Sequence, residues 1–186
     1  MPIVYVRCRA NIFHSFFRKR ILLEKYFLFI AMDKKDRHIL ELLQHDASIS
    51  LQDLAQEVGL SVTPCWRRIQ KLKDDGVITS QVTLCDPAKL NLGLTAFVTV
   101  RAEQHNDAWT RRFISGVCAI KEIVEIYRMT GDVDYMLKVV VPDIAGYDSV
   151  YKRLIKVAEL KDVSSGFAME VVRHTTALPL DYVDGD

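Results

Sequence analysis

The chain has 186 residues, of which 49% are hydrophobic and 26% charged, and its formal net charge at pH 7 is +1. This composition indicates a globular protein, and the length allows one domain or two small ones. No apolar run reaches the roughly 18–20 residues of a membrane span, so we expect a soluble protein. The four cysteines lie far apart, without a CxxC pair or a Cys/His cluster at zinc spacing. This spacing predicts no metal site, and it is typical of proteins in the reducing cytoplasm.

The charge is unevenly distributed along the chain. Residues 1–31 contain six Lys and Arg residues and one Glu, whereas the rest of the chain contains 19 basic and 23 acidic residues. A strongly basic domain would indicate nucleic acid directly. Because residues 32–186 are slightly acidic, any DNA contact there must depend on the local placement of basic side chains.

Residues 1–31 differ from the rest of the sequence in pattern. They hold seven of the seventeen aromatic residues, and Arg18-Lys19-Arg20 interrupts their apolar pieces. They lack the apolar core and cleavage site of a signal peptide. One interpretation is an amphipathic segment that binds a membrane surface or a partner. The interpretation we favour is an upstream extension outside the functional domains, which then start at Met32.

Residues 32–85 predict a winged helix-turn-helix domain. Apolar residues recur at helical spacing after Asp33 and Asp36, and Ser50 is placed as the N-cap of a second helix. The turn Gly59-Leu60-Ser61 separates that helix from a third one. Two short helices joined by a tight glycine turn, the second carrying basic residues, are typical of a helix-turn-helix.

Two further features complete this predicted domain. Val77-Ile78 and residues 81–84 indicate a β-hairpin behind the third helix, which would be the wing. Cys65 shares the apolar face of the third helix with Ile69, so we expect a buried, unreactive thiol rather than a redox switch.

The third helix carries the predicted DNA contacts. A major groove about 12 Å wide admits one helix, and the side chains at its N-terminal end reach the base edges. Arg67 and Gln70 can read bases, whereas Arg68 and Lys71 suit phosphates. The alternative is a small helical bundle with a solvated basic face. The predicted DNA-contacting residues are Ser61, Val62, Thr63, Pro64, Trp66, Arg67, Arg68, Gln70 and Lys71.

Residues 86–93 predict a linker, residues 94–180 a second domain, and residues 181–186 a tail. Apolar periodicity in the second domain predicts strands over residues 94–102, 123–129, 135–141 and 167–172, with helices around residues 109–120 and 147–155. The order βαββαβ is that of a ferredoxin-like (RAM/ACT-like) fold, which makes the whole chain an α+β protein.

One layer of two helices covers only one face of such a sheet. Strand residues such as Phe97, Ile126 and Leu137 cannot all be covered by that layer, so the other face needs a partner. Pairing two copies across a twofold axis would bury it. We therefore predict a homodimer, which also suits pseudo-palindromic DNA.

Two stretches resemble the Lrp/AsnC family of transcription factors (leucine-responsive regulatory protein and asparagine regulator). They are DRHILELLQHDASISLQDLAQEVGLSVTPCWRRIQKLKDDGVI and MTGDVDYMLKVVVPD, and the resemblance extends from Asp33 to Leu180. Four shorter stretches, TPCWRRIQKLKDDGVI, LGLTAFV, YDSVYKRL and FAMEVVRHTTALP, are most similar to the cysteine-responsive, DecR-like branch.

The resemblance implies an amino-acid effector at the dimer interface, with cysteine favoured, and octamers built from dimers. It also implies the effector-binding residues, the last three of them from the partner subunit: Arg128, Met129, Thr130, Gly131, Asp132, Asp134, Ile144, Ser165, Gly166 and Phe167. Gly131 would let backbone amides approach a carboxylate, and Asp134 could accept bonds from an α-ammonium group. The alternative is that the Gly-Asp turn only closes a hairpin.

The sequence contains no P-loop, no GxGxxG and no GxSxG, and its histidines are scattered, so we predict neither catalysis nor a cofactor. The leading hypothesis is a sequence-specific transcriptional regulator that responds to an amino acid. The second is an architectural, nucleoid-associated DNA-binding protein with little effector response. The third is a metabolic enzyme or regulatory subunit in which the helix-turn-helix is vestigial.

Overall fold

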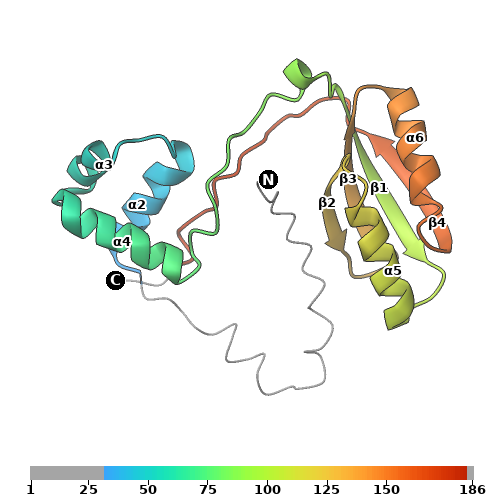
Figure 1. Ribbon diagram of the computed structural model, residues 1–186, viewed down its shortest axis with the longest axis horizontal. Coiled ribbons are helices and arrows are strands. Elements are labelled where there is room, and N and C mark those ends of the chain that lie inside the picture. Colours follow the sequence, from blue (N-terminus) through green and yellow to red (C-terminus); the bar gives the residue numbers. More distant parts are fainter. Residues whose placement is uncertain (1–31, 184–186) are drawn as a thin grey trace, which may run out of the picture. The chain divides into compact units, whose positions relative to one another are not determined.

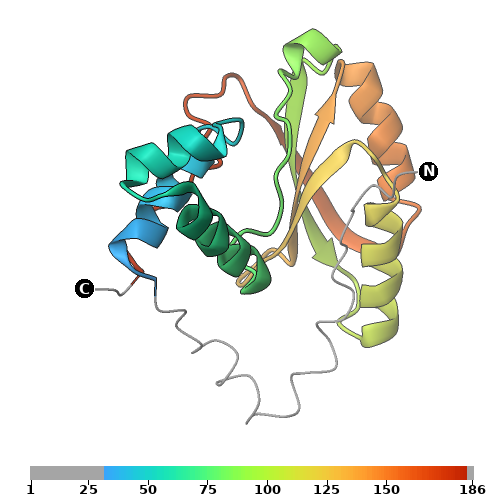
Figure 2. The same ribbon diagram turned by 60° about the vertical axis from the view of Figure 1, so that its left-hand side comes forward.

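The computed structural model describes residues 32–183, and the predictions for residues 1–31 lie outside this range. The described chain forms two compact units (Figures 1 and 2). Residues 32–84 and 172–183 make up the helical unit, and residues 85–171 make up the sheet unit. Each unit has its own hydrophobic core.

The helical unit contains α2 (Lys34–His45), α3 (Leu51–Val58) and α4 (Val62–Asp74). Their ends follow from local sequence signals. Asp33 and Asp36 form a capping box at the start of α2, and the Ser50 side chain accepts a hydrogen bond from the backbone N–H of Asp53. Gly59 ends α3 with φ 66°, a left-handed conformation that glycine adopts without strain. The core of the unit consists of Met32, Ile39, Leu40, Leu54, Ala55, Val58, Cys65 and Leu72.

The hairpin predicted after α4 is absent from the described structure of the single chain. Residues 77–84 form no strand, and Val82 and Leu84 are exposed. Val77 and Ile78 instead pack against the helical core, and the Ile78 N–H bonds to the carbonyl of Leu72. Because Val77 and Ile78 pack into the helical core, they do not form a strand with which residues 81–84 could pair.

The C-terminal segment belongs to the helical unit rather than to the sheet unit. The side-chain amide of Gln44 both donates to the Leu178 carbonyl (3.2 Å) and accepts from its N–H (2.7 Å). Leu180 and Val183 pack against the helical core. The sequence pattern predicts a second domain that extends to residue 180, whereas the structure groups the chain from Val172 onward with the helices.

The sheet unit has the order βαββαβ. After a short 3₁₀ helix (Ala88–Leu90), its elements are β1 (Leu94–Ala102), α5 (Asp107–Cys118), β2 (Ile123–Arg128), β3 (Tyr135–Val141), α6 (Ile144–Leu154) and β4 (Leu160–Phe167). The strands form one sheet in the order β2-β3-β1-β4 with every pair antiparallel. Helices α5 and α6 cover the same face of the sheet (Figures 1 and 2).

The side-chain alternation of the strands decides which residues face these helices. Val98, Leu137 and Val139 are fully buried among residues of α5 and α6, and Ile126 packs against the same core. Phe97 lies on the opposite face, where it is exposed. Of the three residues predicted to need a partner, only Phe97 therefore lies on the uncovered face.

The last strand lies earlier in the chain than predicted. The sequence pattern indicates residues 167–172, whereas β4 is Leu160–Phe167. Phe167 pairs with Ala96, and the Ala168 N–H bonds to the Thr95 carbonyl, so the following residues run past the start of β1. A strand over 167–172 would have no partner there. The actual strand is largely exposed, so its side chains lack the apolar alternation that identifies a strand in sequence.

Within residues 32–183, none of the helices combines the length and the apolar character that crossing a membrane requires.

The close packing of α5 yields a test of the sheet unit. A Cβ added to Gly116 would overlap with Cγ1 of Val157, a half-buried β-branched residue. We expect Gly116→Ala to destabilise the unit by about 1–3 kcal/mol through overpacking, measured by urea unfolding. Adding Val157→Ala to this variant should recover most of the lost stability. If the effects of the two substitutions on the free energy of unfolding are simply additive, the two side chains do not clash.

Candidate DNA-binding and effector sites

Helix α4 presents its predicted DNA-contacting side chains to solvent because its opposite face is buried. Cys65 and Leu72 are buried in the helical core and Ile69 packs against it. This leaves Trp66 (51% exposed) and Arg67 pointing away from the core. Ser61 is the N-cap of α4, and its side chain makes no capping hydrogen bond. Val62, Thr63 and Pro64 form an exposed first turn. Gln70 is half-buried and Lys71 is exposed.

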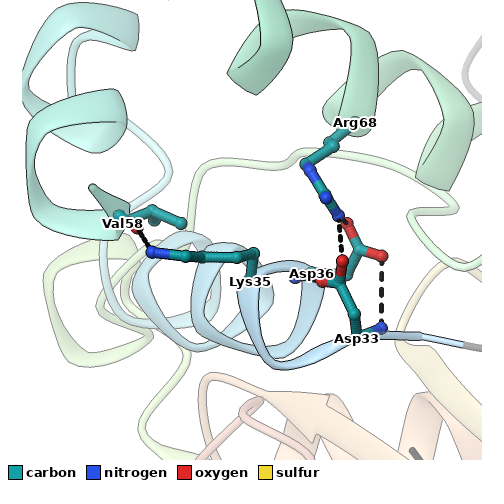
Figure 3. Close-up of polar contacts among 5 residues, drawn as sticks. All are labelled: Asp33, Lys35, Asp36, Val58 and Arg68. Carbon is teal, nitrogen blue, oxygen red and sulfur yellow. Dashed lines mark hydrogen bonds and ion pairs between the residues drawn. The ribbon is translucent and has the colours of Figure 1, made fainter. Parts of the chain in front are cut away.

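The basic residues of α4 fall into two groups. Arg67, Lys71 and Lys73 are exposed and form no ion pair within residues 32–183. Arg68 differs, because its Nη1 lies 2.7 Å from Asp33 Oδ2 and 2.7 Å from Asp36 Oδ1 (Figure 3). The sequence predicts a phosphate contact for Arg68, whereas the structure places its guanidinium against the start of α2.

This ion pair shifts the pKa values of its members. The backbone N–H of Asp36 and the Arg68 guanidinium hold the pKa of Asp33 below its usual value. Hydrogen bonds to Asp36 and Asp33 raise the pKa of Arg68. Burial raises the pKa of the Cys65 thiol, although the charge of Arg68 opposes this, and the thiol is free. A protonated, buried thiol is a poor nucleophile.

A second link from α2 was missed by sequence reasoning. The Lys35 ammonium donates a hydrogen bond to the Val58 carbonyl at the last residue of α3 (Figure 3). Helix α2 therefore holds α3 through Lys35 and α4 through Arg68. Neither link has a signal in the sequence, because the paired residues are 23 and 32 positions apart.

The first group of predicted effector residues surrounds the connection from β2 to β3. Arg128 is the last residue of β2, and Met129, Thr130, Gly131, Asp132 and Asp134 follow it. Gly131 adopts φ 96°, which favours glycine. The Met129 N–H bonds to the Asp134 carbonyl (2.9 Å), and Arg101 Nε bonds to the Asp132 carbonyl (2.6 Å). These bonds fix the connection at the end of the sheet.

The Asp134 carboxylate already has a partner in the single chain. Its Oδ2 accepts a hydrogen bond from the Ala102 N–H (2.8 Å), and its Oδ1 lies 3.6 Å from His105 Nδ1. It therefore holds the end of β1, and its remaining acceptor capacity could serve an ammonium group.

The second group of predicted effector residues lies elsewhere in the unit. Ile144 begins α6 and is exposed, and Ser165, Gly166 and Phe167 end β4. Tyr147 of α6 contacts the end of β4, through a hydrogen bond with the Ser165 hydroxyl and an edge-to-face contact with Phe167 (centroids 5.1 Å apart).

The register of β1 shows that the two groups are far apart in one chain. Ala96 pairs with Phe167 near the start of β1, whereas Val100 pairs with Tyr135 and Ala102 bonds to Asp134 at its end. With about 3.3 Å per strand residue, Phe167 and the Asp134 carboxylate lie roughly 20 Å apart along β1, and Ser165, which pairs with Val98, lies roughly 13 Å from that carboxylate. One chain does not bring them into a common site.

No group of three or more His, Cys, Asp or Glu residues able to hold a metal ion occurs between residues 32 and 183.

The Arg68 ion pair predicts a pH-dependent stability. The pKa of Asp33 is lower in the folded protein than its ordinary value, which is near 4. Ionised Asp33 therefore contributes to the free energy of unfolding at pH values above about 4. This contribution is lost as the pH falls through the lowered pKa. We expect Arg68→Met to destabilise the helical unit by about 1–2 kcal/mol at pH 7. Below pH 4, the variant should lose less stability than the wild type does. Thermal unfolding between pH 3 and 7 measures both effects. Arg67→Met, one residue away and exposed, is the control, and an equal loss there would contradict the assignment.

Comparison with known proteins identifies both units. Residues 32–79 match a family model described as "Winged helix-turn-helix DNA-binding", and residues 95–178 match one described as "Lrp/AsnC ligand binding domain". The chain is 46% identical over 151 residues to the DNA-binding transcriptional activator DecR of Escherichia coli, covering 81% of this chain and 99% of that protein. It is also 46% identical to the glutamate uptake regulatory protein of Zymomonas mobilis, over 80% of this chain and 91% of the relative.

Solved structures show the same relationship. An AsnC family transcriptional regulator from Agrobacterium tumefaciens is 56% identical with a TM-score of 0.79, over 81% of this chain and 99% of that one. A transcriptional regulator from Neisseria meningitidis in complex with L-Met is 32% identical with a TM-score of 0.77, over 81% and 98% of the two chains. The order of the elements, the family models and these relatives agree, and the chain belongs to the Lrp/AsnC family of transcriptional regulators.

Proposed function

We propose that this regulator binds double-stranded DNA through α4 and that an amino acid bound between two subunits controls this binding. For the DNA contact, the main support is that Arg67, Lys71 and Lys73 are exposed on one helix without ion-pair partners in the described chain. Arg67 and Gln70 read base edges, and Lys71 contacts phosphate. The exposed Ser61, Val62, Thr63, Pro64 and Trp66 line the groove-facing end of the helix, and Arg68 positions it.

For the effector site, the single observation that carries the proposal is the separation of its two groups along β1. Residues 128–134 and residues 165–167 can share one ligand only if they come from different subunits. The exposed Phe97 and Tyr127 on the face of the sheet without helices provide the apolar surface of a homodimer. Ile144 and the end of β4 then reach the partner's residues at positions 128–134.

The effector we propose is an amino acid, with cysteine favoured. This choice is supported by the similarity to DecR and by the structure of the Neisseria relative with L-Met, which shows that an amino acid binds that protein. The name of the Zymomonas relative refers to glutamate uptake. Ligand binding would shift the equilibrium between dimers and octamers in the cytoplasm, and so change which pairs of α4 helices engage DNA together.

The DNA-binding assignment is tested at Arg67. We expect Arg67→Ala to weaken binding to a promoter fragment by about ten- to a hundredfold, because one good base contact contributes about 1–3 kcal/mol. Fluorescence anisotropy at fixed salt measures this. Lys161→Ala removes the same charge from the sheet unit and serves as the control. Unchanged binding of Arg67→Ala would remove α4 from the proposal.

The effector assignment is tested by thermal shift with each of the twenty amino acids. Ligand at about 100 times its Kd should stabilise the protein by about 2.7 kcal/mol, a shift of a few degrees. We expect Asp134→Asn to reduce the shift, because it keeps an acceptor for the Ala102 N–H but removes the charge that attracts an ammonium group. If no amino acid shifts the wild type and DNA sequences are bound alike, the architectural alternative is correct.

A further inference from the structure

Two large hydrophobic side chains are exposed on α4, the helix that we propose to bind DNA. Val62 is 45% exposed and Trp66 is 51% exposed, whereas α2 and α3, the other helices of the described helical unit, expose no large hydrophobic side chain. Neither residue packs against the helical core, although Cys65, Ile69 and Leu72 of the same helix do. Packing within the described helical unit therefore does not account for this exposed pair.

Val62 and Trp66 form one strip along the N-terminal half of α4, which we call the apolar strip. Val62 begins the helix and Trp66 follows four residues later. Residues four positions apart lie one turn apart on the same face of a helix, so the two side chains are neighbours. Thr63 and Arg67, each the next residue along the chain, form a polar strip that is rotated by about 100° from the apolar one. The first two turns of α4 therefore present both kinds of surface next to each other.

The apolar strip lies on a cationic helix. Arg67, Lys71 and Lys73 are exposed and form no ion pair within residues 32–183. Asp74 is the only acidic residue of α4, and it stands at the C-terminal end, away from the strip. A partner that fits this helix therefore combines negative charge with an apolar group that a helix can reach.

Duplex DNA offers such a group in its major groove, between two rows of phosphates. The 5-methyl group of thymine projects into this groove, where the other groups that identify the bases are hydrogen-bond donors and acceptors. Valine and tryptophan side chains gain free energy when they remove that methyl group from water, and cytosine has no methyl group at this position. An apolar strip in the groove thus distinguishes thymine from cytosine without a hydrogen bond.

We propose that Val62 and Trp66 recognise the 5-methyl groups of thymines, so that the protein selects thymine at the base pairs that the first two turns of α4 reach. The inference rests on the proposed binding of DNA through α4, and it adds the base that the helix selects. Arg67 contacts hydrogen-bonding groups of the base edges, and the apolar strip contacts the methyl groups. Both contacts depend on sequence, whereas Lys71 contributes affinity for any duplex.

The test removes the methyl groups from the DNA and leaves its base pairing unchanged. A duplex that the full-length wild-type protein selects from a random library is synthesised twice, once with thymine and once with deoxyuridine at every thymine position. Deoxyuridine differs only by the missing 5-methyl group. Fluorescence anisotropy at one salt concentration gives the two Kd values. We expect the deoxyuridine duplex to bind at least about fourfold more weakly, the effect of one buried methyl group, and a smaller ratio overturns the inference.

Matched variants locate the methyl recognition on α4. Trp66→Ala should reduce the ratio of the two Kd values to about twofold or less, and Val62→Ala should lower it as well. Arg67→Ala should weaken binding to both duplexes and keep the wild-type ratio, because its proposed contact involves no methyl group. Val124→Ala removes a comparably exposed valine (55%) from β2 of the sheet unit, and this control should keep the wild-type ratio. If circular dichroism shows that Trp66→Ala is unfolded, Val62→Ala decides alone.

The remaining outcomes separate this inference from the proposed function. If Arg67→Ala weakens binding but deoxyuridine has no effect on the wild type, α4 binds DNA and only the inference is overturned. An unchanged ratio in the variants of the apolar strip also overturns it, since the methyl effect then arises elsewhere in the complex. If neither Arg67→Ala nor deoxyuridine changes binding, or if the library yields no preferred sequence, the inference and base reading by α4 fail together.

Discussion

Strand β1 is hydrogen-bonded in antiparallel register on both sides, and the functional geometry of the sheet unit depends on this pairing. The β3 register brings the connection after β2 to the end of β1, and the β4 register brings Phe167 near its start. A shift by one residue would turn the buried side chains of β1 toward the open face, so the buried core fixes the register. The separation of the two effector groups is therefore a consequence of folding, and a shared site follows only from association of subunits.

In the helical unit, α2 has the corresponding organising role. Its first turn binds Arg68 of α4 through Asp33 and Asp36, and Lys35 caps the end of α3. Successive residues on a helix point about 100° apart, so Arg67 faces solvent while its neighbour Arg68 faces α2. Arg67 is thus exposed for the DNA contact that we propose, whereas Arg68 keeps the helix in position. Base reading of the kind proposed for α4 requires side chains that start from a defined geometry.

What could be predicted from the sequence was mostly local. Caps, glycine turns and apolar periodicity located α2, α3, α4 and the first three strands, because each depends on residues a few positions apart. The exposure of Arg67 also followed from helical periodicity. The partner of Arg68 could not be predicted in this way, since the pair is distant in sequence. Strand β4 was misplaced because pairing with β1 defines it, whereas its own side chains are mostly polar and exposed.

The path of the chain after β4 connects the proposed effector site with the helical unit. Within residues 32–183 the chain passes between the two units twice, after Leu84 and again around Val171. The second crossing starts directly after Phe167 and ends where Gln44 of α2 binds Leu178. Because α2 also binds α4 through Arg68, the segment that leaves β4 ends on the helix that holds α4. The polypeptide thus connects the end of β4 covalently to a segment that is hydrogen-bonded to α2.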